Sequence, residues 1–585
     1  MTRCNPHLFL LLLAFTWAHV SGVPADNPSR HASVSAAEPT DTQSNASEET
    51  EVTEPDVMRD LQKRSVTTQK PVYGHWGLEQ GKYSSWTSHS NRLIPVYTYG
   101  ITLDRLRERG SAYADQQRLD KLTGQSNNDA FNPIALYFDQ TAVYDLQQAA
   151  VDAGYSNIIV MVFDGMDWNT TRAASIYKTG NADQPSGRGS GLAFQDDRRA
   201  ITDFGFVCTS AAAGGARTDV DAQTVLSVNE GTHSGFDVRL GGTAPWHERT
   251  GSPYLLGKDR SRAHTVTDSA SSATSLFSGI KTYNGAINVD VEGNQVQPIA
   301  RQLQAEQDFM IGVVTSVPVS HATPAAAYAN NVSRKDYQDI SRDLVGLPSA
   351  AHREPPLPGV DVLIGGGWGE GKQADKVQGR NFAQGNPYFH QDDLRASDLK
   401  HGGRYRVAQR TKGKSGRDLL LETAQQAADH GERLLGFFGT KGGHLPFATA
   451  DGDFQPTIDV KNAERYSPED VRENPTLADM TEAALLVLEQ SIDGFWLMVE
   501  AGDVDWANHS NNLDNSIGAV LSGEQAFRVV MDWVDRNNAW DHTAVILTAD
   551  HGHYLVIDHP EEIASAGRTA RSKKRSDDAA PVQEP

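Results

Sequence analysis

The sequence predicts an α/β fold, a three-layer sandwich in which helices cover both faces of a large, mostly parallel central sheet. Five apolar runs show no alternation with polar residues, at 157–163, 311–315, 360–364, 495–499 and 543–548. Such runs are typical of parallel strands buried on both faces, and helical stretches separate them along the chain. Asp164, Glu500 and Asp550 lie just past the ends of three runs. Because open α/β sheets place their sites at the carboxyl ends of strands, we expect a functional site there.

Composition and charge narrow the class of protein. The 585 residues are 38% hydrophobic and 22% charged, which is enough for a sizeable core. The formal net charge of −22, from 53 Lys and Arg against 75 Asp and Glu, would repel phosphate backbones, so we expect no nucleic-acid partner. After residue 25 no apolar run reaches the roughly 20 residues that cross a bilayer, so we expect no membrane span.

The first 25 residues have the pattern of a signal peptide. Arg3 precedes an apolar run over 8–17, and small residues follow near cleavage positions after Gly22 or Ala25. A buried N-terminal helix is the alternative interpretation. The signal peptide predicts an exported protein, either periplasmic or extracellular.

Two further segments are predicted to be disordered. Residues 26–64 are rich in Ser, Thr, Pro and acidic residues and read as a disordered acidic spacer, and 566–585 reads as a disordered tail. The folded domain is therefore expected at 65–565. Once Cys4 leaves with the signal peptide, Cys208 is the only cysteine, so no intramolecular disulfide is expected and metals would help to hold the fold.

Carboxylates and imidazoles follow the predicted strands in a pattern that suits metal ions. The candidates are Asp164, Glu500, Asp505, His509, Asp550 and His551. This mixture is the ligand set for zinc with a harder, magnesium-like ion beside it. Asp505 and His509 are four residues apart, so one helical turn would place both on one face. For any single residue a structural role is the alternative, but without a metal the clustered carboxylates would repel one another.

A nucleophile candidate lies in the run of small residues 267–274. Its Asp-Ser start predicts a tight loop entering a helix with Ser269 at the N-terminus, where the helix dipole favours an alkoxide and then a phosphoryl group. The alternative is that Asp268 or Ser269 only caps the helix.

Six segments together resemble the motifs of the alkaline phosphatase family, in the order of that family. They are Asp164-Gly-Met166, Val266-Thr-Asp-Ser-Ala270, Gly279 to Ile287, His321-Ala-Thr-Pro324, Val499-Glu-Ala-Gly502 with Asp505 and His509, and Thr548-Ala-Asp-His551 with His553. The resemblance covers about 157–335 and 475–555. It implies an alkaline phosphatase-like fold and a catalytic domain over 65–565 with insertions near 181–262 and 365–470.

The resemblance implies a role for each matched residue. Ser269 would be the catalytic nucleophile and form a phosphoserine, and Arg334, 11 residues after Thr323, would bind two phosphoryl oxygens. Two zinc ions and one magnesium ion are implied. The zinc that activates Ser269 would be held by Asp164, Asp550 and His551. The zinc that activates water would be held by Asp505 and His509. The magnesium would be held by Asp164, Thr323 and Glu500. His321 and Trp506 would tune these sites, and His553 would orient a ligand.

One ligand of the family pattern is missing from its usual place. The family supplies a third ligand to the water-activating zinc from a histidine tens of residues after the Asp-His pair, in a segment followed by a strand, but only 34 residues follow His551. The interval from Asp164 to Ser269 is 105 residues, about twice the family's, and contains Gly231-Thr-His233-Ser-Gly-Phe-Asp-Val238. Our hypothesis is that the ligand segment is relocated upstream and that His233 is the third ligand. An ordinary loop with a surface histidine is the alternative, with His559 as the next ligand candidate.

The expected activity is hydrolysis of small phosphate monoesters with an alkaline pH optimum. A phosphodiesterase of the same superfamily and a catalytically dead metal- or phosphate-binding protein are the alternatives, whereas the sulfatase motif Cys/Ser-x-Pro-x-Arg is absent at Ser269. A homodimer is one option for the assembly. The regions 65–150 and 365–470 match no family motif. A helix is expected over 418–435, and both regions are candidates for shaping the substrate entrance or an oligomer interface.

Overall fold

The computed structural model describes residues 56–124, 130–184, 187–202, 206, 215–228, 266–457 and 465–579. Within these residues, nine strands form a central sheet. In spatial order they are β10 (Tyr405–Gln409), β11 (Arg433–Phe437), β9 (Val362–Gly366), β8 (Met310–Pro318), β12 (Phe495–Ala501), β4 (Asn157–Phe163), β13 (Thr543–Thr548), β3 (Val96–Tyr99) and β5 (Ile201–Thr202).

The sheet is mostly parallel, as the apolar runs predict. The seven strands from β10 to β13 are parallel to their neighbours, whereas β3 is antiparallel to β13 and β5 is antiparallel to β3. Strands β4, β12 and β13 are buried along their whole length, which explains why their sequences do not alternate. All five predicted strands are confirmed.

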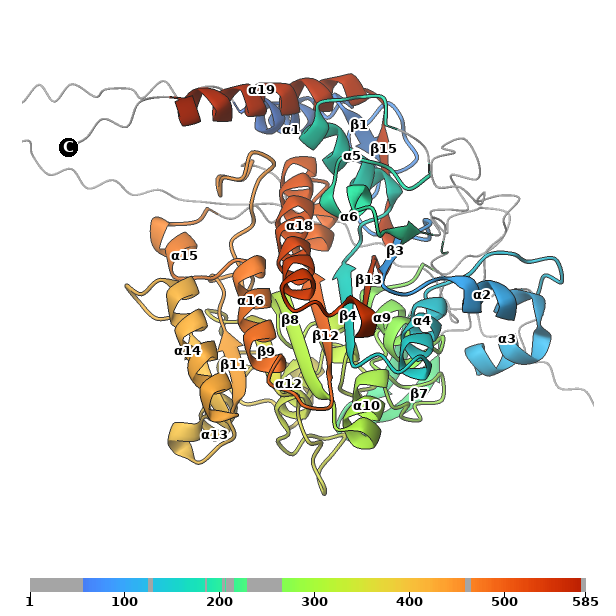
Figure 1. Cartoon of the computed structure of the whole chain (residues 1–585), viewed down its shortest axis with the longest axis vertical. Helices are drawn as coiled ribbons and strands as arrows, with labels where there is room; N and C mark the ends of the chain where they lie inside the picture. Colours follow the sequence, from blue (N-terminus) through green and yellow to red (C-terminus); the bar gives the residue numbers. More distant parts are fainter. Residues whose placement is uncertain are drawn as a thin grey trace, which may run out of the picture. The chain divides into compact units, whose positions relative to one another are not determined.

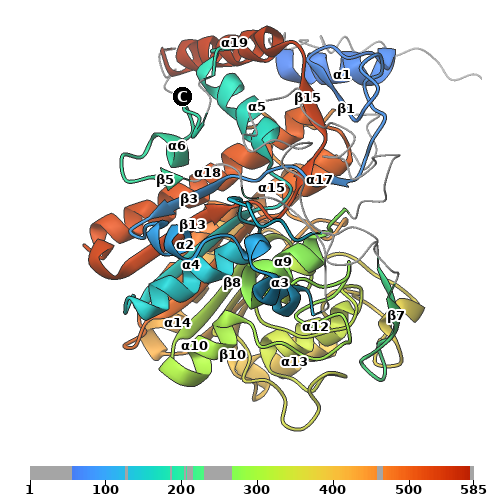
Figure 2. The ribbon, with the colours of Figure 1, turned by 90° about the vertical axis from the view of Figure 1, so that its right-hand side faces the viewer.

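Helices cover both faces of the sheet. One layer contains α14 (Gly416–His430), α16 (Leu477–Leu488) and α18 (Leu513–Arg536), and the other contains α4 (Thr141–Asp152), α9 (Ser269–Ser278) and α10 (Ile299–Gln307). Figure 1 shows α14, α16 and α18 side by side, and Figure 2 shows α18 on one side of β3 and β13 with α4 and α9 on the other. The predicted three-layer α/β architecture is confirmed.

Two buried contacts fix the helix that carries the nucleophile candidate. Trp496 of β12 is fully buried, and its indole N–H donates to Gln147 Oε1 of α4 at 2.9 Å. Its ring meets Phe277 of α9 edge-on at 5.5 Å. The central strand therefore sets the position of both α4 and α9 through a side chain whose polar atom is satisfied.

The predicted disordered spacer ends earlier than residue 64. Helix α1 (Val57–Thr68) begins at an Asp56 cap, whose side chain accepts from the Arg59 N–H at 3.1 Å. Met58 and Leu61 on one face of α1 are buried against the domain. The burial of this narrow apolar stripe stabilises a helix in a sequence that is otherwise polar.

The predicted disordered tail also begins too early. Helix α19 (Pro560–Ala579) covers most of 566–585 and packs beside α5 (Trp168–Thr179), as Figure 1 shows. Ile563 is fully buried, and the Arg571 guanidinium donates to Tyr177 O near the C-terminus of α5 at 3.0 Å. Basic side chains at a helix C-terminus satisfy its free carbonyls, which explains why a basic run is ordered here.

The helix predicted over 418–435 is too long. Helix α14 ends at His430 because Gly431 adopts a left-handed conformation, with φ 64°, and β11 starts at Arg433. In the insertion near 181–262, β6 (Ala216–Asp219) and β7 (Thr224–Val228) form a hairpin. The predicted signal peptide, residues 26–55 and the His233 segment lie outside the described residues. In the part of the chain that is described, no helix combines the length and the apolar character needed to cross a bilayer.

Candidate metal and nucleophile site

Ser269 is the first residue of α9. The preceding Asp268 caps the helix, with its carboxylate accepting from the Ser271 N–H at 3.0 Å. Ser269 Oγ lies 3.1 Å from His551 Nε2 and is buried in the described structure. Asp268 is thus the capping residue, and Ser269 faces the candidate metal ligands, so its role as nucleophile stays a prediction. The free N–H groups at this helix end favour an anion beside Ser269.

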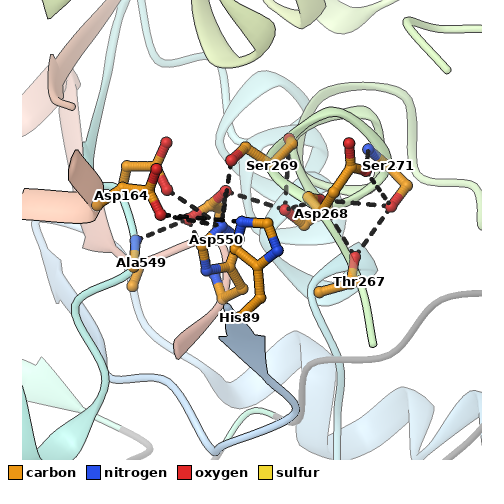
Figure 3. Close-up of polar contacts among 12 residues, drawn as sticks. His89, Asp164, Thr267, Asp268, Ser269, Ser271, Ala549 and Asp550 are labelled. Carbon is orange, nitrogen blue, oxygen red and sulfur yellow. Dashed lines mark hydrogen bonds and ion pairs between the residues drawn. The ribbon is translucent and has the colours of Figure 1, made fainter. Parts of the chain in front are cut away.

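Asp164, Asp550 and His551 meet at the carboxyl ends of β4 and β13. Nε2 of His551 lies 3.2 Å from Asp164 Oδ1 and 3.5 Å from Asp550 Oδ2. Asp550 also accepts from the Ser272 hydroxyl at 3.0 Å, which ties this group to α9. Figure 3 shows Asp164, Asp550 and Ser269 around one centre. The three side chains offer ligand atoms within 4.8 Å of one another.

Gly165 is required by this close approach. It has a φ of 70°, and a Cβ at this position would lie 2.8 Å from Cδ2 of His553. Any other residue would be strained and would push His553 away from the site. Asp164 therefore supplies a candidate ligand, and Gly165 leaves room for the His553 ring directly beside it.

Asp505 and His509 lie one turn apart on α17 (Asp503–His509), as their spacing predicts. Asp505 Oδ1 is 3.4 Å from His509 Nε2 and 2.7 Å from His553 Nε2. The second contact places His553 where the resemblance expects it, beside a ligand rather than at the nucleophile. The His509 ring is held by Thr87 O, 2.8 Å from its Nδ1.

His89 completes this group and was not predicted from the sequence. Its Nε2 lies 3.2 Å from His509 Nε2 and 3.9 Å from Asp505 Oδ1. His89 is in β2 (His89–Ser90), which pairs with β14 (Gly552–His553) and so lies beside His553. No local pattern of the sequence points to His89, because only the pairing of β2 with β14 brings it to the site.

Glu500, Thr323 and Asp164 form the oxygen-rich part of the site. Glu500 is the last residue but one of β12 and accepts a hydrogen bond from the Thr315 hydroxyl. Thr323 in α11 (Ala322–Ala326) lies close enough to help lower the pKa of Glu500, yet its buried Oγ1 has no hydrogen bond of normal geometry. The Glu500 and Asp550 charges both raise the pKa of Asp164. An all-oxygen set of this kind suits magnesium.

The clustered charges shift the pKa values strongly. Burial raises the pKa of Glu500 to about 8 and that of Asp550 to about 6, and burial with the neighbouring carboxylates raises that of Asp164. Burial lowers the pKa of His551 to about 3. Burial would also raise the pKa of Asp505, but the histidines around it hold that pKa well below its usual value. A bound cation would stabilise the ionised form of these buried carboxylates and would be coordinated by the neutral imidazoles.

The donor set fits divalent cations. Asp164 Oδ1, Thr323 Oγ1 and His551 Nδ1 are buried without hydrogen-bond partners among the described residues. Buried polar atoms are normally satisfied, so these atoms point to a missing ligand. The described residues also form the ligand groups Asp164/Asp550/His551, Asp505/His551/His553 and His89/Asp505/His509. Mixed nitrogen and oxygen donors suit zinc.

Arg334 is held beside the site by an ion pair with Asp268. Its guanidinium donates to Asp268 Oδ2 at 2.9 Å, and it lines the same cavity as Asp505 and His509. Burial alone would lower the pKa of Arg334, but the Asp268 carboxylate raises it. A permanent cation is thus held one residue from Ser269.

The structure brings almost all predicted site residues to one edge of the sheet. These are Asp164, Ser269, Thr323, Arg334, Glu500, Asp505, His509, Asp550 and His551. His233 lies outside the described residues, so its role stays a prediction.

Comparison with known proteins agrees with this geometry. The family model described as alkaline phosphatase matches residues 252–579, more than half of the chain. The chain belongs to the alkaline phosphatase family. Alkaline phosphatase 4 of Bacillus subtilis (strain 168) is 29% identical over 315 residues, which cover 52% of this chain and 55% of the relative. Alkaline phosphatase H of Pseudomonas aeruginosa (strain UCBPP-PA14) is 30% identical over 329 residues, with 53% and 62% covered.

The aligned segments thus span little more than half the length of these family members. Among solved structures, the cold-active alkaline phosphatase from the psychrophile Shewanella sp. is 22% identical and covers 68% of each chain, with a TM-score of 0.38.

Proposed function

We propose that this protein hydrolyses phosphate monoesters through a phosphoserine on Ser269, at a site that holds two zinc ions and one magnesium ion. The observation that carries the proposal is the position of Ser269 Oγ, at a helix N-terminus and 3.1 Å from His551, at the edge of the sheet where the other candidate ligands lie. Family membership supports the same reaction class.

The residues of the chain divide the reaction between them. Ser269 Oγ attacks phosphorus, the leaving alcohol departs, and water then hydrolyses the phosphoserine to free Ser269. Arg334 donates hydrogen bonds to two phosphoryl oxygens, which favours a terminal phosphate over a diester. The N-terminus of α9 stabilises negative charge on the same group. Burial of the site excludes bulk water and strengthens each of these interactions.

The grouping of the candidate donor atoms supports the following assignment of metal ligands. One zinc would be held by Asp164, Asp550 and His551. The other zinc would be held by Asp505, His509 and His89, and His233 is the alternative to His89 as its third ligand. Asp164, Thr323 and Glu500 would hold magnesium. When bound, such ions would lower the pKa of oxygen nucleophiles and neutralise the charge of the phosphate.

The proposal includes export to the periplasm or the extracellular space, as the N-terminal sequence predicts. A catalytically dead binding protein is the competing function, but the described site lacks none of the proposed reacting groups. Small phosphate esters are the expected substrates.

Turnover of p-nitrophenyl phosphate at pH about 9 tests the proposal. Chelator-treated protein should be inactive and should regain activity with zinc and magnesium. The Ser269→Ala variant should lose at least about a thousandfold in kcat. Ser275→Ala, on the same helix but bonded to backbone carbonyls, is the matched control and should retain activity. A metal-reconstituted wild type without turnover, or an active Ser269→Ala variant, would contradict the proposal.

A further inference from the structure

A cavity of about 620 Å³ opens beside the phosphate site. Arg334, Asp505 and His509 line it, so the cavity is continuous with the groups that we assign to phosphate and metal binding. Its volume is in the range of small-molecule pockets. A group that enters this space while its phosphate is at Ser269 must be the leaving group of the ester.

The walls of the cavity are built from aromatic rings that come from two loops and one helix, α17, each of which follows a parallel strand of the sheet. Tyr388 follows β9, His444 and Phe447 follow β11, and Trp506 follows β12. These strands are parallel, so their carboxyl ends bring the loops to the edge where the catalytic residues lie. The two loops, which carry Tyr388, His444 and Phe447, belong to the region 365–470, one of the two regions that the sequence left as candidates for the substrate entrance or an oligomer interface.

The rings form a continuous surface. His444 stacks on Phe447, with centroids 4.1 Å apart and planes at 23°, and Trp506 meets His444 edge-on at 5.2 Å. Trp506 also lies 5.3 Å from His321, and His321 stacks on Tyr337 with an interplanar angle of 8°. The aromatic surface therefore runs from the outer part of the cavity to the phosphate site.

Charge is scarce on these walls. Apart from Arg334 and Asp505, which belong to the phosphate site, Glu370 is the only charged side chain among the described lining residues. An anionic or strongly hydrated leaving group would gain little here. A flat, uncharged ring would stack on the exposed faces of these side chains.

We propose that this cavity is a leaving-group site for a planar aromatic ring and that the enzyme prefers phosphate monoesters that carry one, such as nucleoside 5′-monophosphates. This inference rests on the proposed function, since it names the substrate class of the same site. Tyr466 also lines the cavity, where its ring meets that of His444 edge-on at 6.1 Å. The rings of Phe447 and Tyr466 determine specificity without touching the reacting atoms.

The test compares AMP with ribose 5-phosphate, because both esters release a ribose 5′-alkoxide and differ in the base alone. The metal-reconstituted wild type should show a kcat/KM for AMP at least about fivefold above that for ribose 5-phosphate, since stacking of one base on an aromatic ring supports roughly a fivefold to hundredfold gain. Phe447→Leu and Tyr466→Leu, which keep an apolar side chain but remove the ring, should bring the ratio toward one. Phe131→Leu, an aromatic residue outside the cavity, should keep the wild-type ratio.

A wild-type ratio near one, or a ratio that neither Phe447→Leu nor Tyr466→Leu lowers, overturns the inference while the proposed function stands. A misfolded variant is recognised because both substrates then fail together. If the wild type hydrolyses neither ester, the proposed function fails. Equilibrium dialysis then tests the inference by measuring the binding of the two esters. The inference requires AMP to bind more tightly than ribose 5-phosphate, and it fails if the two bind equally.

Discussion

His89 Nε2 lies 3.2 Å from His509 Nε2, although 420 residues separate the two in the sequence. The contact forms because β2 pairs with β14 and so brings His89 next to His553, while α17 holds His509 one turn after Asp505. Two imidazoles and a carboxylate that converge in this way are a donor set that would suit zinc, as we propose for this group.

His89→Ala should therefore raise the zinc concentration that gives half-maximal activity by at least about tenfold, because the loss of a ligand weakens zinc binding. Zinc titration of chelator-treated protein measures this. His559→Ala is the matched control, since His559 is half exposed and faces Glu561. His233→Ala decides the competing hypothesis. A normal zinc requirement for His89→Ala with a raised one for His233→Ala would move the third ligand to His233.

Arg334→Ala should weaken phosphate binding. The side chain is fixed by Asp268 and would hold two phosphoryl oxygens, so its loss should lower kcat/KM by roughly 10²-fold and raise the inhibition constant of inorganic phosphate. Arg334→Lys should recover little, because lysine cannot bind two oxygens with one planar group. Arg380→Ala, at a residue whose side chain is 90% exposed, is the control. An unchanged inhibition constant for Arg334→Ala would remove this residue from the phosphate site.

Stability of the metal-free protein should fall as the pH rises through the site's carboxyl pKa values. Burial raises the pKa of Glu500 to about 8, so the folded protein holds a proton that the unfolded chain loses near pH 4. Its stabilising effect is complete below pH 4 and is lost as the pH approaches 8, by up to about 1.4 kcal/mol per pH unit. The site histidine His551, whose pKa is lowered to about 3, acts in the opposite sense but only below about pH 6.5.

Thermal unfolding of chelator-treated protein between pH 6.5 and 8 measures this effect. The melting temperature should fall over that window, and zinc with magnesium should remove the fall. Glu500→Gln keeps the shape without the titrating group, so its metal-free form should show a shallower fall. A flat profile for the metal-free wild type would show that Glu500 does not titrate as its burial requires.

Arg571→Ala should lower the free energy of unfolding by about 1–3 kcal/mol. The change removes the hydrogen bonds to Tyr177 O and Lys178 O and leaves these carbonyls, part-buried, at the C-terminus of α5. Denaturant unfolding with Lys574→Ala as an exposed control on the same helix measures the difference. Equal stability of the two variants would show that α19 is held without this residue.

Local patterns predict most of the site, because most of its residues stand at the ends of recognisable elements. Asp164 and Asp550 follow the apolar strands β4 and β13, and Glu500 lies at the carboxyl end of the apolar strand β12. Asp505 and His509 share a helical turn. None of these positions depends on which strands pair. Ser269 can also be placed from local sequence, because the Asp268-Ser269 pair at the start of α9 is a helix-capping pattern.

His89 could not be found in this way, because its place depends on long-range pairing. A two-residue strand has no periodicity of its own, and only its pairing with β14 brings it to Asp505. The ends of the domain were misplaced for a related reason. The helices α1 and α19 have polar sequences, and the few apolar residues that anchor them, such as Met58 and Ile563, are informative only once their burial is known.

The central claim is that Ser269 becomes phosphorylated during turnover. Metal-reconstituted protein should be mixed with inorganic phosphate, quenched with acid and digested, and the peptide that contains Ser269 examined by mass spectrometry. The account predicts a phosphorylated peptide in the wild type and none in Ser269→Ala or in the metal-free protein. Phosphate on another residue, or an active wild type whose Ser269 peptide is never phosphorylated, would contradict it.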